Sequence, residues 1–191
     1  MVTRHAAQLA DFETWAAARD WATFHCSHYD WWAFPIDERS GGQGWRYTVL
    51  PGDVDELRRN AAYMTRLRRG AELLALSWGW DLTAAAPLPA SALTRYQRWA
   101  NWPVRLYKAA KCMRLFGFTA EFASLVKLGR VRLATGEDFS YGGHDLSWLF
   151  KLPLEGEAAA PSAASAASTA AGAGVAPATA GGSGGASGAH A

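Results

Sequence analysis

A change of composition at Glu155 most limits what this chain can fold into. From Glu155 to the last residue the sequence is almost entirely Ala, Gly, Ser, Thr and Pro, with no aromatic residue and no Lys or Arg. Such a segment cannot bury enough apolar surface to offset the entropy lost on ordering it. Repeated glycines and the prolines Pro161 and Pro177 also disfavour a stable helix. We therefore predict a helical domain over residues 1–154 and a disordered tail over residues 155–191.

The first part of the chain carries all ten tryptophans. Its length of about 150 residues is typical of one domain. Tryptophan is large, and its indole N–H needs a partner when the ring is buried. This content predicts a thick aromatic core, exposed aromatic surface, or both.

Hydrophobic periodicity predicts helices along most of this domain. Apolar residues recur every three or four positions in "AAYMTRLRRGAELLALSW" and in "NWPVRLYKAAKCMRLFG", and the second run ends at a glycine stop. Asp53 and Glu56 have the spacing of a capping box. The only strand-like run is "WRYTVL", residues 45–50. The predicted fold is an all-α, compact bundle of about five helices with little or no strand, and the predicted helices cover residues 6–32 (in one or two pieces), 54–59, 60–78, 92–99, 101–116 and 119–136.

Charge and cysteine content favour an ordinary intracellular protein. The formal net charge is +2, and two cysteines, Cys26 and Cys112, are too few for a disulfide scaffold. No apolar run is long enough to cross a membrane, and the first residues lack a signal-peptide core. We expect a cytoplasmic or nuclear location and no membrane partner.

The stretch "HCSHYD" carries residues that could support chemistry: His25, Cys26, His28 and Asp30. All four can bind metals, and the two histidines could share a helical face. However, the paired spacings typical of a structural zinc site are absent. Neighbouring residues on a helix also point apart, which places Cys26 and His25 poorly as nucleophile and base. A metal-dependent or cysteine enzyme is therefore an alternative, and we assign no catalytic residue, metal or cofactor.

Basic residues recur on two of the predicted helices. A shared electropositive face with tyrosine and tryptophan between the cations could bind phosphates and stack bases. Nucleic-acid binding is a second alternative. Ordinary solvated helix surface explains the same residues, which are Arg58, Arg59, Arg66, Arg68 and Arg69 on one helix and Arg105, Lys108, Lys111 and Arg114 on the other.

Three stretches, in order, resemble the conserved region of the opioid growth factor receptor family: "HYDWWAFPID", "RRGAELLALSWGWDL" and "RYQRWANWPVRLYKAAKCMRLFG". The resemblance covers roughly residues 20–130. It departs from the family pattern before the basic helix, where the family has His-Asn and this chain has "NWPVR". The matching positions are His28, Trp32, Phe34, Pro35, Glu72, Leu73, Leu74, Trp78, Gly79, Tyr96, Arg98, Asn101, Arg105, Lys108, Leu115 and Gly117.

The resemblance implies an association with peptide binding, since the vertebrate member is associated with an enkephalin peptide. It supplies no catalytic residues. Tryptophan and tyrosine are also favoured anchors in binding sites. We therefore expect a non-enzymatic module that binds a peptide or protein, with Tyr29, Trp31 and Trp45 as exposed rings. The predicted ligand-binding residues are His28, Tyr29, Asp30, Trp31, Trp45, Arg105 and Lys108.

Overall fold

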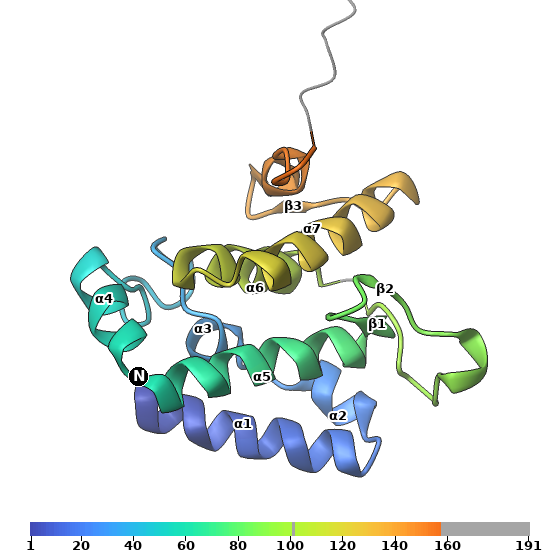
Figure 1. Cartoon of the computed structure of the whole chain (residues 1–191), viewed down its shortest axis with the longest axis horizontal. Helices are drawn as coiled ribbons and strands as arrows, with labels where there is room; N and C mark the ends of the chain where they lie inside the picture. The colour runs from blue at the N-terminus through green and yellow to red at the C-terminus, as the bar shows by residue number, and fades with distance from the viewer. Residues whose placement is uncertain (101, 158–191) are drawn as a thin grey trace, which may run out of the picture. The chain divides into compact units, whose positions relative to one another are not determined.

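Two pairs of long helices organise the chain. In the computed structural model, which describes residues 1–100 and 102–157, α1 (Val2–Ala17) packs along α5 (Ala61–Ser77). Similarly, α6 (Pro103–Phe116) packs along α7 (Thr119–Ala134). Figure 1 shows the second pair lying across the first. The predicted all-α class is confirmed.

The region predicted as helix over residues 6–32 forms three helices. After α1 come α2 (Trp21–Cys26) and α3 (Asp30–Ala33). The first break lies at Arg19, whose φ of 55° is left-handed. Asp20 then caps α2 by accepting a hydrogen bond from the Thr23 amide at 3.1 Å, which satisfies an otherwise unpaired helix donor.

The next helix, α4 (Pro51–Arg59), begins earlier than expected. Pro51 occupies the first turn, where its missing N–H costs nothing. Asp53 lies inside this turn and accepts a hydrogen bond from the Leu50 amide at 2.8 Å, so the prediction that it starts the helix is wrong. Asn60 separates α4 from α5 and caps α5 through the Tyr63 amide at 2.9 Å.

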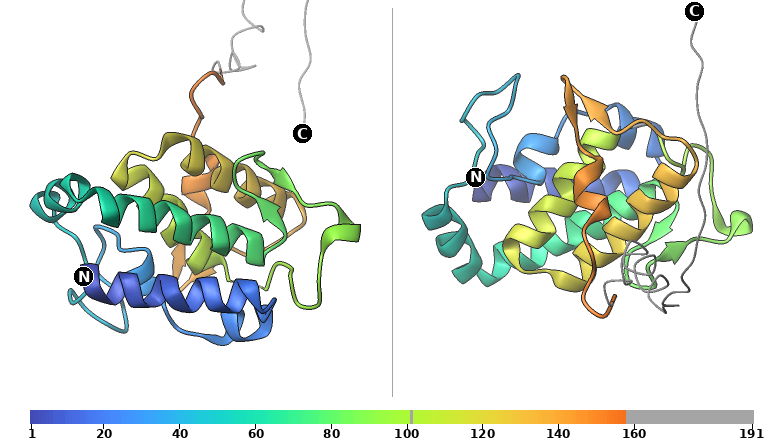
Figure 2. Two further views of the ribbon diagram at one scale, coloured as in Figure 1. Left: turned by 60° about the horizontal axis from the view of Figure 1, so that its bottom comes forward. Right: turned by 90° about the horizontal axis from the view of Figure 1, so that it is seen from above.

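The remaining elements are short. The strands β1 (Trp80–Asp81) and β2 (Ala86–Pro87) pair antiparallel, as do β3 (Ser140–Tyr141) and β4 (His144–Asp145). The 3₁₀ helices are η1 (Ala90–Ala92) and η2 (Ser147–Lys151). Figure 2 shows the β3–β4 hairpin and η2 from above.

Two local predictions are wrong. Residues 45–47 form a turn and residues 48–50 have no regular structure, so this run is not a strand. Residues 93–99 form no helix: Tyr96 has a left-handed φ of 65°, and the Gln97 side chain accepts from the Thr94 amide at 3.1 Å. Side-chain capping thus replaces the helical hydrogen bonds in this segment.

The buried stripes connect these elements into one core. The periodicity predicts a buried stripe of Met64, Leu67, Ala71, Leu74 and Trp78 along α5, of which Met64 is half-buried and the other four are buried. An aromatic cluster joins α1 to the following segments, since the ring of Phe12 lies 4.5 Å from those of Phe24 and Tyr29 between centroids. Residues 1–154 form one compact unit.

The predicted tail falls largely on residues 158–191, which lie outside the described residues. Among the residues that are described, no helix has the length and apolar character needed to span a membrane.

Candidate functional site

The segment "HYDW" meets helix α6 through Arg105. This side chain is only 1% exposed. Its Nη1 donates to the His25 carbonyl at 3.2 Å and to the Tyr29 hydroxyl at 3.1 Å, and its Nη2 donates to the Ser27 carbonyl at 2.9 Å. Its Nε lies 3.4 Å from Asp30 Oδ1. We call these groups the Arg105 cluster.

Aromatic rings complete the cluster. The guanidinium carbon of Arg105 lies 4.4 Å from the ring centroid of Tyr29 and 4.6 Å from that of Trp102. Such cation–π contacts gain strength when water is excluded. Burial raises the pKa of Tyr29 above its usual range, so its hydroxyl stays protonated. The cluster therefore joins two distant segments and offers no exposed recognition surface.

Several predicted ligand-binding side chains differ from expectation in their exposure to solvent. Tyr29 is 0% exposed, so the expectation that it is an exposed ring is wrong. Arg105 and Lys108 are buried, and their predicted surface positions are wrong as well. Trp31 is half-buried, whereas His28 and Trp45 are exposed as a binding surface requires. The fold nevertheless brings Tyr29, Asp30, Trp31, Arg105 and Lys108 into one region.

Lys108 and Trp31 line a hollow beside the Arg105 cluster. The hollow is shallow: its cavity volume is about 10 Å³, room for about one water molecule, and the surrounding empty space, which includes open solvent, is about 200 Å³. Lys108 Nζ lies 5.4 Å from the centroid of the Trp31 ring. We call this feature the Lys108 hollow, and its lining includes Trp31, Glu38, Ser40, Tyr47, Thr48 and Lys108.

A short loop forms one wall of the Lys108 hollow. Ser40 and Gly44 close it through a pair of backbone hydrogen bonds of 3.0 and 2.9 Å. Trp31 Nε1 donates to Ser40 Oγ at 2.9 Å and fixes the loop to α3. The next residue after this closed turn is Trp45, which is 64% exposed. Trp45 thus follows a residue that lines the hollow, Gly44, and is not itself a lining residue.

Acidic residues at the rim bind other residues of α6. Tyr107 donates to Glu38 Oε1 at 2.8 Å, and Lys111 pairs with the same carboxylate and with Asp37 at 2.8 Å. Burial and the Glu38 carboxylate raise the pKa of Tyr107. Burial lowers the pKa of Lys108, and the charges of Asp30 and Glu38 oppose this effect. Sequence patterns missed Glu38, Ser40 and Tyr107, because only the fold brings the loop to α6.

The candidate metal ligands do not converge. His25 Nε2 lies 3.1 Å from the Tyr96 carbonyl, Asp30 pairs with Arg105, and Cys26 is exposed at the end of α2. Within residues 1–100 and 102–157, no three His, Cys, Asp or Glu side chains gather closely enough to hold a metal ion. Burial lowers the pKa of His25, which favours its neutral form in this structural position.

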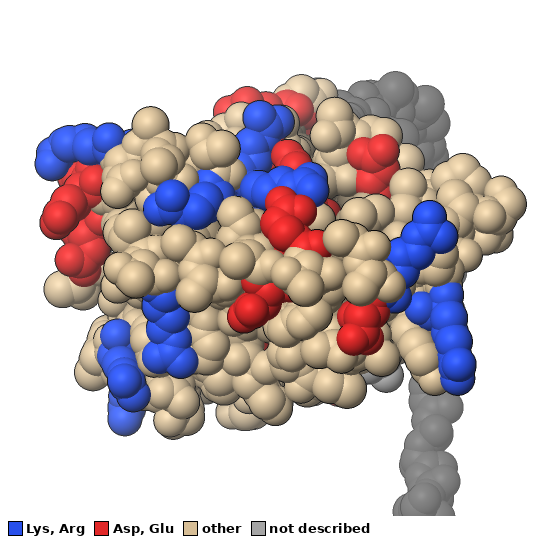
Figure 3. Space-filling model, turned by 90° about the horizontal axis from the view of Figure 1, so that it is seen from below, with Lys and Arg blue, Asp and Glu red and all other residues tan. Residues whose placement is uncertain are grey.

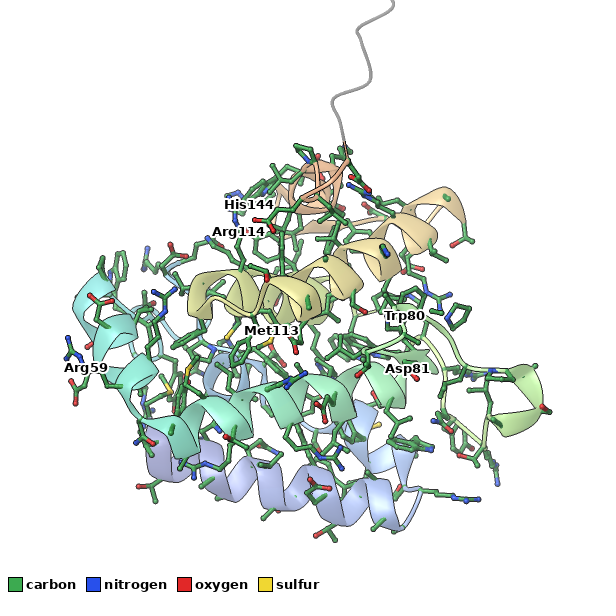
Figure 4. All side chains as sticks on the ribbon, viewed as in Figure 1. Arg59, Trp80, Asp81, Met113, Arg114 and His144 are labelled. Atoms are coloured by element: carbon green, nitrogen blue, oxygen red, sulfur yellow. The ribbon has the colours of Figure 1, made fainter. Side chains whose placement is uncertain are left out.

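The basic residues also do not form one electropositive face. Arg105 is buried, Arg68 pairs with Glu121 at 2.6 Å, and Arg69 pairs with Glu13 at 2.7 Å. Figure 3 shows acidic and basic side chains interleaved on the face seen from below. Arg114, labelled in Figure 4, lies apart from these pairs, with its guanidinium carbon 5.8 Å from the ring centroid of Phe122.

Comparisons of the chain with models of known protein families, with curated proteins and with solved structures gave no match.

Proposed function

We propose that this protein is a non-enzymatic module that binds a peptide or another protein at the surface formed by Trp45 and the Lys108 hollow. The observation that carries the proposal is the exposure of Trp45. At 64%, it is the most exposed of the large hydrophobic side chains in the described part of the chain. Exposed tryptophan is costly to leave in water and is enriched among the residues that dominate binding energy.

The surroundings of Trp45 support the same function. The hydrogen bonds of the loop hold it in place before a partner arrives, which lowers the entropy cost of binding. The same loop is bonded to a half-buried ring, Trp31, and Gly44, the residue before Trp45, lines the Lys108 hollow. An apolar anchor next to a few polar groups is the usual composition of a binding site.

The resemblance to the opioid growth factor receptor conserved region agrees with this proposal, since the resemblance implies an association with peptide binding. We propose a distant relation to that family on the residues given above. We also propose an intracellular location, cytoplasmic or nuclear, which agrees with the free thiols of Cys26 and Cys112.

Selection from a phage-displayed library of random peptides tests the function. We expect wild-type protein to enrich a shared peptide motif. Trp45→Ala should weaken binding of the enriched peptides by about tenfold or more, as loss of a central anchor does. Tyr141→Ala is the matched control, because this ring is 57% exposed but lies on the β3–β4 hairpin. No enrichment, or equal binding by the Trp45→Ala variant, would overturn the proposal.

A further inference from the structure

Lys108 is a buried cation that lacks a close partner. It is only 9% exposed. Within the part of the chain that the structure describes, its Nζ makes no hydrogen bond and no ion pair, and it lies 5.4 Å from the centroid of the Trp31 ring. Lysine is rarely buried without a paired charge. Among the described residues, Lys108 Nζ is not one of the fully buried polar atoms that lack a hydrogen-bond partner, so the ammonium reaches solvent. An anion that enters from solvent could therefore pair with it.

The nearby carboxylates are already engaged. Asp30 lies against Arg105, with 3.4 Å between Oδ1 and Nε. Glu38 accepts from Tyr107 and pairs with Lys111. These acids moderate the charge of Lys108 from a distance but leave all three of its N–H donors without an acceptor among the described residues.

A second donor lines the same hollow. Ser40 Oγ accepts from Trp31 Nε1 at 2.9 Å and from the Gln43 amide at 3.2 Å. Among the described residues its own hydroxyl proton has no acceptor. Ser40 and Lys108 thus present unused donors to one space that opens to solvent. A carboxylate is an acceptor that can take several such bonds and also neutralise the ammonium.

We propose that the Lys108 hollow binds a single carboxylate group of the partner, either a C-terminal carboxylate or the side chain of Asp or Glu. This inference rests on the proposed function and names the chemistry that its partner carries. A monovalent carboxylate fits better than a phosphate, because the carboxylate of Glu38 lines the hollow and would repel a second negative charge. The carboxylate would enter beside Trp45, which contacts the adjoining apolar part of the partner.

The indole N–H of Trp31 reports directly on the hollow, because it is bonded to Ser40. We would follow its ¹H–¹⁵N signal while adding one of two probes. N-acetylalanine carries a C-terminal carboxylate, and the α-amide of N-acetylglutamic acid carries only a side-chain carboxylate. Sodium chloride would keep the ionic strength constant. We expect a saturable shift with at least one of them and a dissociation constant of about 1 mM, the range of a weak single-group contact. The tighter of the two identifies the source of the carboxylate.

Lys108→Met should weaken this binding by about tenfold or more, while the chain stays folded because it loses a buried unpaired charge. Lys127→Met is the matched control, since Lys127 is an exposed lysine on α7. The proposal is overturned if neither carboxylate gives a saturable shift in wild type, if acetamide gives the same shift, if Lys108→Met binds equally, or if inorganic phosphate binds more tightly.

The two proposals can fail separately. Carboxylate binding without any selected peptide that depends on Trp45 would overturn the proposed function alone. Peptide binding that depends on Trp45 but is unchanged in Lys108→Met would overturn only the carboxylate site.

Discussion

Arg105 links the two segments that build the site. It donates hydrogen bonds to two backbone carbonyls and a phenol and forms an ion pair with a carboxylate, and all four groups come from residues 25–30. A planar guanidinium with five donors can satisfy such a divergent set, whereas lysine cannot. The periodicity of α6 places residue 105 beside the apolar stripe and so predicts a solvated cation. Its burial follows from long-range packing of residues 25–30, which periodicity does not contain.

Replacing Arg105 by methionine should destabilise the fold strongly. The change leaves Asp30 without its ion-pair partner and the His25 and Ser27 carbonyls without their donor, and breaking one side of a buried ion pair costs about 3–5 kcal/mol. Urea unfolding followed by far-ultraviolet circular dichroism measures this loss. Arg59→Met is the control, because Arg59 is exposed and points away from the other elements in Figure 4. A change below about 1 kcal/mol in Arg105→Met would contradict the role given to this cluster.

His5 should make stability depend on pH. It is 2% exposed against Tyr63, and burial lowers its pKa from 6.5 to about 4. As pH falls below 6.5, His5 binds a proton in the unfolded chain but stays neutral in the folded chain. The contribution of His5 to the free energy of unfolding is therefore present above pH 6.5 and is lost as pH falls toward 4. Between pH 7 and pH 5 this amounts to about 2 kcal/mol.

Urea unfolding at the two pH values checks this effect. His5→Gln should lower stability at pH 7 but flatten the pH dependence. Part of the slope should persist, because burial lowers the pKa of His25 in the same direction. His144→Gln, a change at an exposed histidine, should leave the slope as in wild type. An unchanged slope in His5→Gln would exclude His5 as the source.

At the scale of elements, local patterns predict the long helices well. The prediction that α6 stops at Gly117 is confirmed by a left-handed φ of 83° there, and the apolar run after residue 144 packs back as η2 against α7. Patterns fail where side chains replace backbone partners, as at Gln97, or where a distant segment covers a polar face, as at Lys108. Five of the seven predicted ligand-binding residues come together, but their burial depends on contacts across 70 or more positions.

Two helical glycines should respond to alanine in opposite directions. At Gly129 in α7 an added Cβ would lie 2.3 Å from the Phe150 ring, so Gly129→Ala should push η2 away and destabilise by roughly 1–3 kcal/mol. At Gly52 in α4 nothing lies within 4 Å, so Gly52→Ala should stabilise by roughly 0.5–1 kcal/mol. Thermal unfolding of both variants tests the pair. Stabilisation by Gly129→Ala would mean that Phe150 does not pack on α7 in this way.

At the scale of the whole molecule, the basic and acidic side chains of the described residues are interspersed and do not form a separate positive surface. The formal net charge is only +2, and the cations of α5 pair with acids from α1 and α7. Nucleic acids attract proteins mainly through several cations that reach neighbouring phosphates at once. The arrangement therefore disfavours the nucleic-acid alternative and agrees with a partner that is recognised at one site.

Binding of single-stranded DNA tests whether the basic helices or a single site recognise the partner. Fluorescence anisotropy with a labelled oligonucleotide should show no binding at a physiological salt concentration of about 0.15 M and only weak binding at low salt, with a shallow salt slope because few free cations share a face. The double change Glu13→Gln and Glu121→Gln leaves Arg69 and Arg68 with Glu72 as their shared acidic partner and should strengthen the low-salt binding several-fold. Glu56→Gln, which alters the net charge at an exposed residue outside these pairs, should have a smaller effect. Submicromolar binding by wild type at 0.15 M salt, with a steep salt slope, would favour the basic helices as the functional surface over Trp45.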